Sequence, residues 1–362
     1  MQSDADREKY VRRNKCNIVH LDLPVGADAY NDAAKTLVSW IQGGVLTLDE
    51  EPSFTLYRMK FVDSAGLARE TVGVIGALQI EESDSKEVLP HEQTTPKAKT
   101  DRLDLTRATK ANLSPIWGLS LTPQLSTALI EPGQSLGAFT DENGVQHIVE
   151  RVTNRARCAV ISKLIAQHPV VIADGHHRYA VSRTYRDESP KIKDATSILC
   201  YINELIDEQL SVAAIHRLYS DVQFDLLTTQ LKKFFDFSDL PTLSPAIIAR
   251  MSKDGHLTLV TPNGDAKSLQ PKPEKFNGVR NLDSAFLEHA LADIEKVVSY
   301  QHGFTEVTAQ LKTGNFTAAV LIRPVSVAEI HRTATEGLLM PPKSTFFTPK
   351  LQTGLVMRQI TN

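Results

Sequence analysis

A short segment of the sequence, "VVIADGHHRYAVS" at residues 170–182, gathers polar side chains that could hold an anion. The candidates are Asp174, Gly175, His176, His177 and Arg178. The apolar run before them predicts a buried strand, and the spacing of the residues after them predicts a helix. The free N–H groups at the start of a helix attract phosphate, and a glycine allows the tight turn before them. The segment therefore indicates a phosphate site, with an N-cap aspartate followed by surface histidines as the alternative.

A second segment, "HEQTTPKAKTDR" at residues 91–102, combines hydroxyls and cations with the acids Glu92 and Asp101. Lys97 and Arg102 could bind phosphate oxygens there, and Glu92 could act as a base or a metal ligand. The polar composition of the longer stretch 82–102, with two prolines, predicts a loop. A solvated loop without a ligand is the alternative.

A third segment, "MPPKSTFFTPK" at residues 340–350, places two prolines before a cation and two hydroxyls. The prolines restrict the backbone, which would hold Lys343, Ser344 and Thr345 in fixed positions. Lys350 ends the segment and adds a further cation. The alternative is a turn that the prolines stabilise, without a ligand.

The composition is that of a globular protein, with 362 residues, 41% hydrophobic and 23% charged. This length suits one large domain or two of ordinary size. We expect a cytoplasmic protein without a membrane partner, because no apolar run is long enough to span a bilayer and the first residues lack the apolar region of a signal peptide. The three cysteines form no Cys-x-x-Cys pair, so neither a disulfide framework nor a zinc site is indicated.

The net charge of −3 argues against a nucleic-acid partner. Basic residues are nevertheless concentrated, since residues 151–186 contain seven Arg or Lys and one acid. This pattern suits a small anionic ligand better than a long polyanion. The P-loop, the Gly-x-Gly-x-x-Gly fingerprint and the Gly-x-Ser-x-Gly elbow are all absent, so the usual nucleotide and hydrolase motifs do not explain the cations.

The pattern of apolar residues predicts a mixed α/β fold. In the first half we expect helices at about residues 29–42, 102–112 and 157–168, strands at 53–61, 70–82 and 114–121, and a hairpin at 131–148. From residue 222 onward, helices alternate with short strands. We therefore predict two domains, residues 1–221 and 222–362, with the tail 340–350 closing the site of the first.

The three segments, in this order, resemble a bacterial family long filed as a domain of unknown function and related to the ParB/sulfiredoxin fold and to free-serine kinases. The resemblance extends from about Asn14 to Met357. It implies a ParB/sulfiredoxin-like catalytic core followed by a C-terminal α/β domain. Members usually carry an upstream Pro-Pro-Tyr-Asp-like stretch, and this sequence begins after that point. If that stretch contributes to the site, we expect lower activity from this chain.

The resemblance implies a Mg²⁺-assisted transfer of a phosphoryl group from inorganic pyrophosphate to the hydroxyl of free L-serine, giving O-phospho-L-serine. The matching positions make Glu92, Asp174 and His177 the catalytic candidates, with Glu92 as the base and Asp174 also as the metal ligand. The positions expected to bind phosphate are Lys97, Arg102, Gly175, His176, Arg178, Lys343, Ser344, Thr345 and Lys350.

Three alternatives to this function stay open at the level of the sequence. The donor could be ADP or ATP instead of pyrophosphate. The protein could be a ParB-like regulator that binds a nucleotide or DNA without turnover, although its net charge argues against DNA. It could also be a phosphate-ester hydrolase, or a kinase for another small molecule, with the same anion site.

Overall fold

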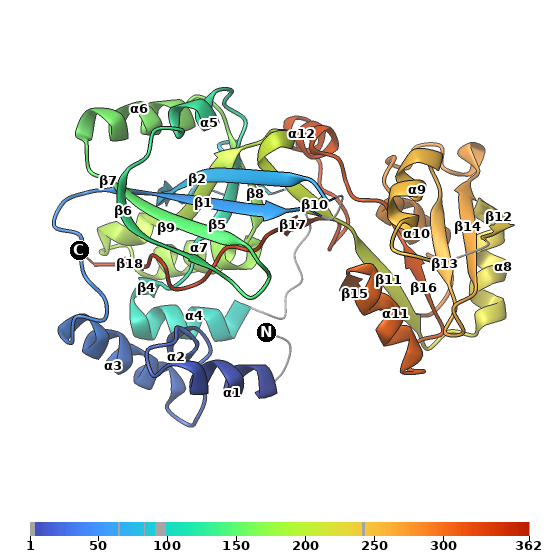
Figure 1. Cartoon of the computed structure of the whole chain (residues 1–362), viewed down its shortest axis with the longest axis horizontal. Helices are drawn as coiled ribbons and strands as arrows, with labels where there is room; N and C mark the ends of the chain where they lie inside the picture. The colour runs from blue at the N-terminus through green and yellow to red at the C-terminus, as the bar shows by residue number, and fades with distance from the viewer. Residues whose placement is uncertain (1–3, 64–65, 83, 91–98, 241–242, 362) are drawn as a thin grey trace.

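The computed structural model describes residues 4–63, 66–82, 84–90, 99–240 and 243–361. Figure 1 shows two bodies side by side, each built around a β-sheet, with the chain passing from the first to the second and then returning. The first body contains the N-terminal half of the chain and the last residues. No helix in the described part of the chain is both long and apolar enough to span a membrane.

The first body is built on an eight-stranded sheet with the order β3-β8-β5-β9-β2-β1-β7-β6. Its strands are β1 (Phe54–Val62), β2 (Ala68–Gln79), β3 (Val88–Pro90), β5 (Ile116–Ser120), β6 (Gln134–Thr140), β7 (Gln146–Val152), β8 (Val170–Asp174) and β9 (Ser197–Glu204). The β3–β8 and β5–β9 pairs are parallel, and the other pairs are antiparallel. The predicted strand pair and the hairpin at residues 131–148 are confirmed as β1–β2 and β6–β7.

Both faces of this sheet are covered at β8, whose successive side chains point to opposite faces. In β8, Val170 and Ile172 pack with α5 (Leu125–Ala128), α6 (Arg155–Ile165) and Tyr179 of α7 (His176–Glu188). The intervening Val171 and Ala173 face the opposite side, where α12 (Val327–Thr335) and the C-terminal segment pack. Because both faces are buried, β8 is a continuous apolar run, as the sequence predicted.

A helical layer lies below the sheet in the view of Figure 1. It consists of α1 (Asp4–Arg13), α2 (Val19–Asp22), α3 (Ala29–Gln42) and α4 (Lys99–Thr109). The buried face of α3 carries Ala33, Leu37 and Trp40, which follow helical spacing and pack with Leu21 and Leu105. Leu103 of α4 packs in turn against α7. This packing fixes α2 and α4 next to the start of α7.

The second body is built on a six-stranded antiparallel sheet with the order β12-β14-β13-β16-β11-β15. Its elements are β11 (Ile215–Ser220), α8 (Phe224–Phe234), β12 (Phe235–Asp239), α9 (Ile247–Asp254), β13 (Leu257–Val260), β14 (Ala266–Pro271), α10 (Asp283–Ala290), β15 (Val297–His302), α11 (Phe304–Lys312) and β16 (Ala318–Leu321). α8 and α10 pack on one face of the sheet, and α9 and α11 pack on the other. A short 3₁₀ helix, Pro273–Lys275, follows β14, and two others, Lys193–Thr196 and Asp207–Gln209, lie earlier in the chain, before β11.

The last part of the chain returns to the first body. α12 packs on the eight-stranded sheet, β17 (Phe346–Thr348) pairs with β10 (Ser211–Ala213), and β18 (Arg358–Gln359) pairs with β4 (Ala111–Asn112). The six-stranded sheet begins with β11, which precedes the boundary predicted at residue 222, and that boundary stays a prediction. The mixed α/β class is confirmed. The ParB/sulfiredoxin likeness of the core is tested by nothing in the fold and stays a prediction.

Candidate active site

The turn between β8 and α7 has the geometry expected from the sequence. Asp174 is the last residue of β8, and Gly175 is the N-cap residue of α7 with φ of 96°. A Cβ atom at Gly175 would lie 2.8 Å from Cγ2 of Ile116, so both the backbone angle and the available space require glycine. The N-cap is therefore Gly175 and not Asp174, which leaves the carboxylate of Asp174 available to other partners.

The carboxylate of Asp174 lies between two cations. Its Oδ2 accepts a hydrogen bond of 2.9 Å from Arg178 Nη2, and its Oδ1 accepts one of 3.3 Å from Lys350 Nζ. Burial opposes the charge of Asp174, but Lys350 and Arg178 outweigh this effect and hold the pKa of its carboxyl below its ordinary value. The side chain is still 42% exposed. Asp174 is thus ionised at neutral pH and accessible to a ligand.

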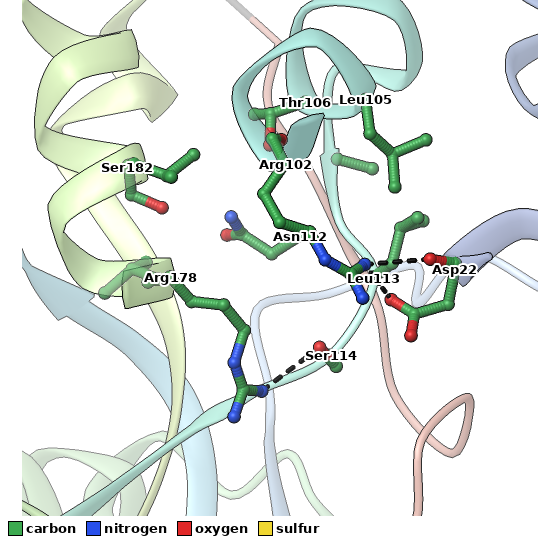
Figure 2. A pocket seen from close by; sticks show the side chains of 12 residues that line it. Asp22, Arg102, Leu105, Thr106, Asn112, Leu113, Ser114, Arg178 and Ser182 are labelled. Atoms are coloured by element: carbon green, nitrogen blue, oxygen red, sulfur yellow. Dashed lines mark hydrogen bonds and ion pairs between the residues drawn. The ribbon is translucent and has the colours of Figure 1, made fainter. Parts of the chain in front are cut away.

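Two arginines reach the same place from different helices. Arg178 of α7 donates to Ser114 Oγ at 3.1 Å, and Arg102 of α4 donates to the backbone and carboxylate oxygens of Asp22, both at 2.8 Å. Figure 2 shows the two guanidinium groups around the chain segment that contains Ser114. Both side chains are 32% exposed, so neither positive charge is closed off from solvent.

These residues surround a cavity of about 390 Å³. Its lining includes Asp22, Arg102, Ser114, Trp117, Asp174, His177, Arg178, Lys350 and Gln352. Three of these side chains are permanently charged cations, and three backbone stretches far apart in sequence supply them. The arrangement suits a small ligand with several negatively charged oxygens, because cationic side chains form strong charge-assisted hydrogen bonds with such oxygens.

A larger cavity of about 830 Å³ continues from the first. The two cavities share Asp22, Arg102, Lys350 and Gln352 in their linings. The larger one extends past α1 toward the β6–β7 hairpin, where Asp141 lines it. The site therefore has a cationic inner part and a wider outer part that contains acids as well.

The structure brings together five of the residues that the sequence proposed for the site. Arg102, Asp174, His177, Arg178 and Lys350 all line the inner cavity. Gly175 and His176 form the adjacent turn and the first residue of α7. Glu92 and Lys97 lie outside the described residues, as does most of the segment that contains them.

The remaining proposed residues occupy another place. Among the described residues that line the inner cavity, Lys343, Ser344 and Thr345 are not found. The backbone oxygen of Lys343 accepts a hydrogen bond of 2.9 Å from Arg217 of β11. Ser344 is buried, where its Oγ donates to Pro341 O at 2.7 Å and lies 3.0 Å from Ser284 Oγ of α10. This part of the third segment contacts the second body, and only its end, at Lys350, reaches the cavity.

Several residues of the cavity were not proposed from the sequence. Asp22 and Ser114 carry no local motif, and nothing in the sequence places them beside Arg102 or Arg178. Gln352 is different, because it follows Lys350 by two residues, and two such side chains share one face of an extended segment. That spacing could have identified it.

A metal site is not evident from the protein side chains alone. In the described part of the chain, no group of three or more His, Cys, Asp or Glu side chains could hold a metal ion. Mg²⁺ in phosphoryl-transfer sites is often held by only one or two carboxylates together with the phosphates of the substrate. Asp174, partly exposed and ionised in the lining of the inner cavity, is a carboxylate that could contribute to that type of site.

Comparison with known proteins gave a family and several distant structural likenesses. The curated proteins contain no match. Free serine kinase in complex with AMP shares 13% identity with a TM-score of 0.45, over 80% of this chain and 91% of that chain. A conserved hypothetical protein from Pyrococcus furiosus shares 12% identity with a TM-score of 0.44, over 80% and 95% of the two chains. SbnI with a C-terminal truncation, from Staphylococcus aureus, shares 11% identity with a TM-score of 0.44, over 79% and 87%.

The family assignment rests on a match of the sequence to a family model. Residues 1–285 match the family described as protein of unknown function (DUF1015), and this range is well over half of the chain. It includes the first two chemistry-bearing segments, at residues 91–102 and 170–182, and the cavity residues Asp22 and Ser114. The chain therefore belongs to the DUF1015 family.

Proposed function

We propose that the protein is a phosphotransferase that moves a phosphoryl group from inorganic pyrophosphate to the hydroxyl of free L-serine. The observation that carries this proposal is the convergence of Arg102, Arg178 and Lys350 on one cavity that also contains the carboxylate of Asp174. The choice of serine and of pyrophosphate comes from the resemblance of the three sequence segments to a family with free-serine kinases.

The chemistry of the proposed reaction fits such a cavity. Phosphoryl transfer requires little covalent chemistry from the protein, and it depends on alignment and on neutralising the charge of the transferred oxygens. Arg178 and Arg102 can bind phosphate oxygens in a fixed geometry, because the guanidinium group is planar and offers paired donors. The start of α7, with His176 and His177, adds N–H groups and the positive end of a 13-residue helix.

Asp174 and Glu92 have different roles in the proposal. Asp174 would hold Mg²⁺, which when bound supplies further positive charge to the phosphoryl oxygens. Its salt bridges to Arg178 and Lys350 also keep both cations oriented toward the cavity. Glu92 is proposed as the base for the serine hydroxyl, on the strength of the sequence resemblance alone.

A nucleotide donor is the second candidate, and one observation favours it. The outer cavity of about 830 Å³ shares Arg102 and Lys350 with the inner one. Pyrophosphate would need only the cationic inner part, whereas a nucleotide could place its phosphates there and its nucleoside in the outer part. The donor therefore has to be determined directly.

The test is a donor panel with serine as the acceptor. The protein is incubated with L-serine and Mg²⁺ and with pyrophosphate, ADP or ATP, and O-phosphoserine is quantified by ³¹P NMR. We expect product with pyrophosphate. Product only with ADP or ATP would replace the donor and keep the kinase, and folded protein that gives no product with any donor would contradict the proposal.

Two arginines of α7 provide a matched pair of variants for this assay. Arg178→Ala removes a cation of the cavity, and Arg183→Ala removes one from the same helix that does not line it. We expect a loss of at least about tenfold in kcat/KM for the first variant, as for the loss of a charge-assisted hydrogen bond. The second variant should be close to wild type.

A further inference from the structure

A chain of polar contacts connects the buried core of the first body to the wall of the cavity. It begins at Gln352, which lines both the inner and the outer cavity. The backbone N–H of Gln352 donates to the Tyr57 hydroxyl at 3.3 Å, and its side-chain Nε2 donates to Asp141 Oδ2 at 3.3 Å. Gln352 is therefore held at two points, by Tyr57 of β1 and by Asp141 of the β6–β7 hairpin.

His147 lies between Tyr57 and Asp141, the two residues that hold Gln352. The Tyr57 hydroxyl lies 2.8 Å from His147 Nδ1, and His147 Nε2 lies 3.3 Å from Asp141 Oδ2. Because the Tyr57 oxygen accepts from Gln352, its own proton is free to bind His147 Nδ1, which must then act as acceptor. Nε2 consequently carries the ring proton and faces the carboxylate. Three hydrogen bonds and the 3.3 Å contact between His147 Nε2 and Asp141 Oδ2 connect Gln352, Tyr57, His147 and Asp141 in a circuit.

The circuit is protected from water on the core side and open on the cavity side. Tyr57 is 1% exposed and His147 is 0% exposed, whereas Asp141 lines the outer cavity. Burial opposes the charge of Asp141, but the N–H of Val145 and the His147 ring outweigh it and lower the pKa of its carboxyl. Asp141 is therefore a charged acceptor at neutral pH, and hydrogen bonds to charged acceptors are stronger than neutral ones.

The segment that the circuit holds also carries Lys350. Lys350 Nζ donates to Asp174 Oδ1 and lies 4.4 Å from the centre of the Phe346 ring. A lysine has a long and flexible side chain, so its position depends on how firmly its backbone is held. Gln352, two residues further along in the lining of the same cavity, provides a fixed point for this backbone.

We propose that Tyr57, His147 and Asp141 form a latch that positions residues 350–353 at the cavity, and thereby positions Lys350 for its anionic ligand. Tyr57 and His147 touch no ligand in this role and act only through Gln352. The identity of the ligand, a phosphate or pyrophosphate, rests on the proposed function. The positioning of the segment itself does not.

Two tyrosines of the same core allow a matched experiment. Tyr57→Phe removes the hydroxyl that binds Gln352 and His147 and keeps the packed ring. Tyr201→Phe is the control, because its ring lies 5.8 Å from that of Tyr57, and its buried hydroxyl makes no hydrogen bond within the described part of the chain. Both variants remove one buried hydroxyl and keep the ring, so they differ in whether hydrogen bonds are lost with it.

Hydrogen exchange of the backbone amides tests the latch without any ligand. In the full-length protein, we expect exchange over residues 350–353 to be about fivefold faster in Tyr57→Phe than in wild type, and unchanged in Tyr201→Phe. A fivefold factor corresponds to about 1 kcal/mol, the typical net contribution of one hydrogen bond. Equal exchange in the two variants would overturn the latch.

Binding of pyrophosphate, measured by calorimetry, tests the consequence for the site. We expect the Kd to rise about fivefold in Tyr57→Phe and to stay within twofold in Tyr201→Phe. An unchanged Kd in Tyr57→Phe would overturn the positioning of Lys350. If wild-type protein binds no pyrophosphate, the proposed donor fails, while the exchange experiment still decides whether the latch exists.

Discussion

Two of the Asp–Arg pairs in the molecule, one in each body, have the same composition but different surroundings. In the second body, Asp283 at the start of α10 accepts from the backbone N–H of Arg323 at 2.7 Å and from its Nε at 3.0 Å. In the first body, Asp174 accepts from Arg178 at 2.9 Å. The side chain of Asp283 is 3% exposed, and that of Asp174 is 42% exposed.

The difference separates a structural ion pair from one that can bind a ligand. Both oxygens of Asp283 are taken by one arginine, which ties α10 to the end of β16. The oxygens of Asp174 are divided between Arg178 and Lys350, each of which reaches in from a separate element and borders a cavity. A substrate oxygen could replace one of these contacts without exposing a buried charge. The site is therefore identified by the exposure of the carboxylate and by how its oxygens are shared among partners, and not by residue type.

The largest effect expected from this comparison is on stability. Asp283→Ala should lower the free energy of unfolding by about 3 kcal/mol, because it leaves a partly buried arginine and a backbone N–H without their acceptor. Asp174→Ala should lower it by less than about 1 kcal/mol, since exposed ion pairs contribute little. Urea unfolding of both variants measures the two values. Equal losses would remove the distinction between the pairs.

A buried histidine gives the second body a specific sensitivity to acid. His216 is 2% exposed, and its Nδ1 accepts from the backbone N–H of Ile322 at 3.1 Å. Burial, together with the charges of Arg217 and His302, lowers the pKa of His216 to about 4. The unfolded chain binds this proton near pH 6.5, so the unfolded state gains protons first as the pH falls.

Stability contributed by neutral His216 is therefore complete above about pH 6.5 and is lost as the pH falls toward 4. The total loss is about 3 kcal/mol, because each unit of pKa difference is worth about 1.4 kcal/mol. In His216→Asn, where the side-chain oxygen can still accept from Ile322, this part of the pH dependence should disappear. Urea unfolding at several pH values measures it, and parallel curves for variant and wild type would contradict the assignment.

Much of the fold was predictable because local patterns determine it. Helix 29–42 follows from the spacing of its apolar residues, and the β6–β7 hairpin follows from the Asp-Glu-Asn-Gly turn at its tip. The strand–glycine–helix unit at residues 170–188 needed only the apolar run, Gly175 and the helical spacing after it. These features depend on neighbours within one element, which a single sequence contains.

The site was predictable only in part, because side chains from separate elements form it. Arg178 and Asp174 are four residues apart and could be placed together from the sequence. Asp22 reaches the cavity through the packing of α2 on α4, which no local pattern indicates. The third segment shows the limit most clearly, because residue type alone does not distinguish Lys343 from Lys350.

The smallest expected effect is on the affinity for pyrophosphate, and it distinguishes Lys350 from Lys343. Lys350 lines the cavity, whereas Lys343 is exposed and has a φ of 57°. We compare Lys350→Asn with Lys343→Asn, because asparagine tolerates the left-handed backbone at residue 343. The Kd for pyrophosphate should rise about tenfold in Lys350→Asn, which corresponds to about 1.4 kcal/mol for one charge-assisted contact, and less than twofold in Lys343→Asn.

Calorimetric titration with pyrophosphate at two salt concentrations measures both values. The effect of Lys350→Asn should shrink at high salt, since its side chain is partly exposed and its charge is screened. A loss of affinity in Lys343→Asn alone would place the phosphate near the second body, beside Arg217. In that case the partly exposed pair Asp174–Arg178 would have no more of a functional role than the buried pair Asp283–Arg323. Exposure of the carboxylate would then no longer identify the site.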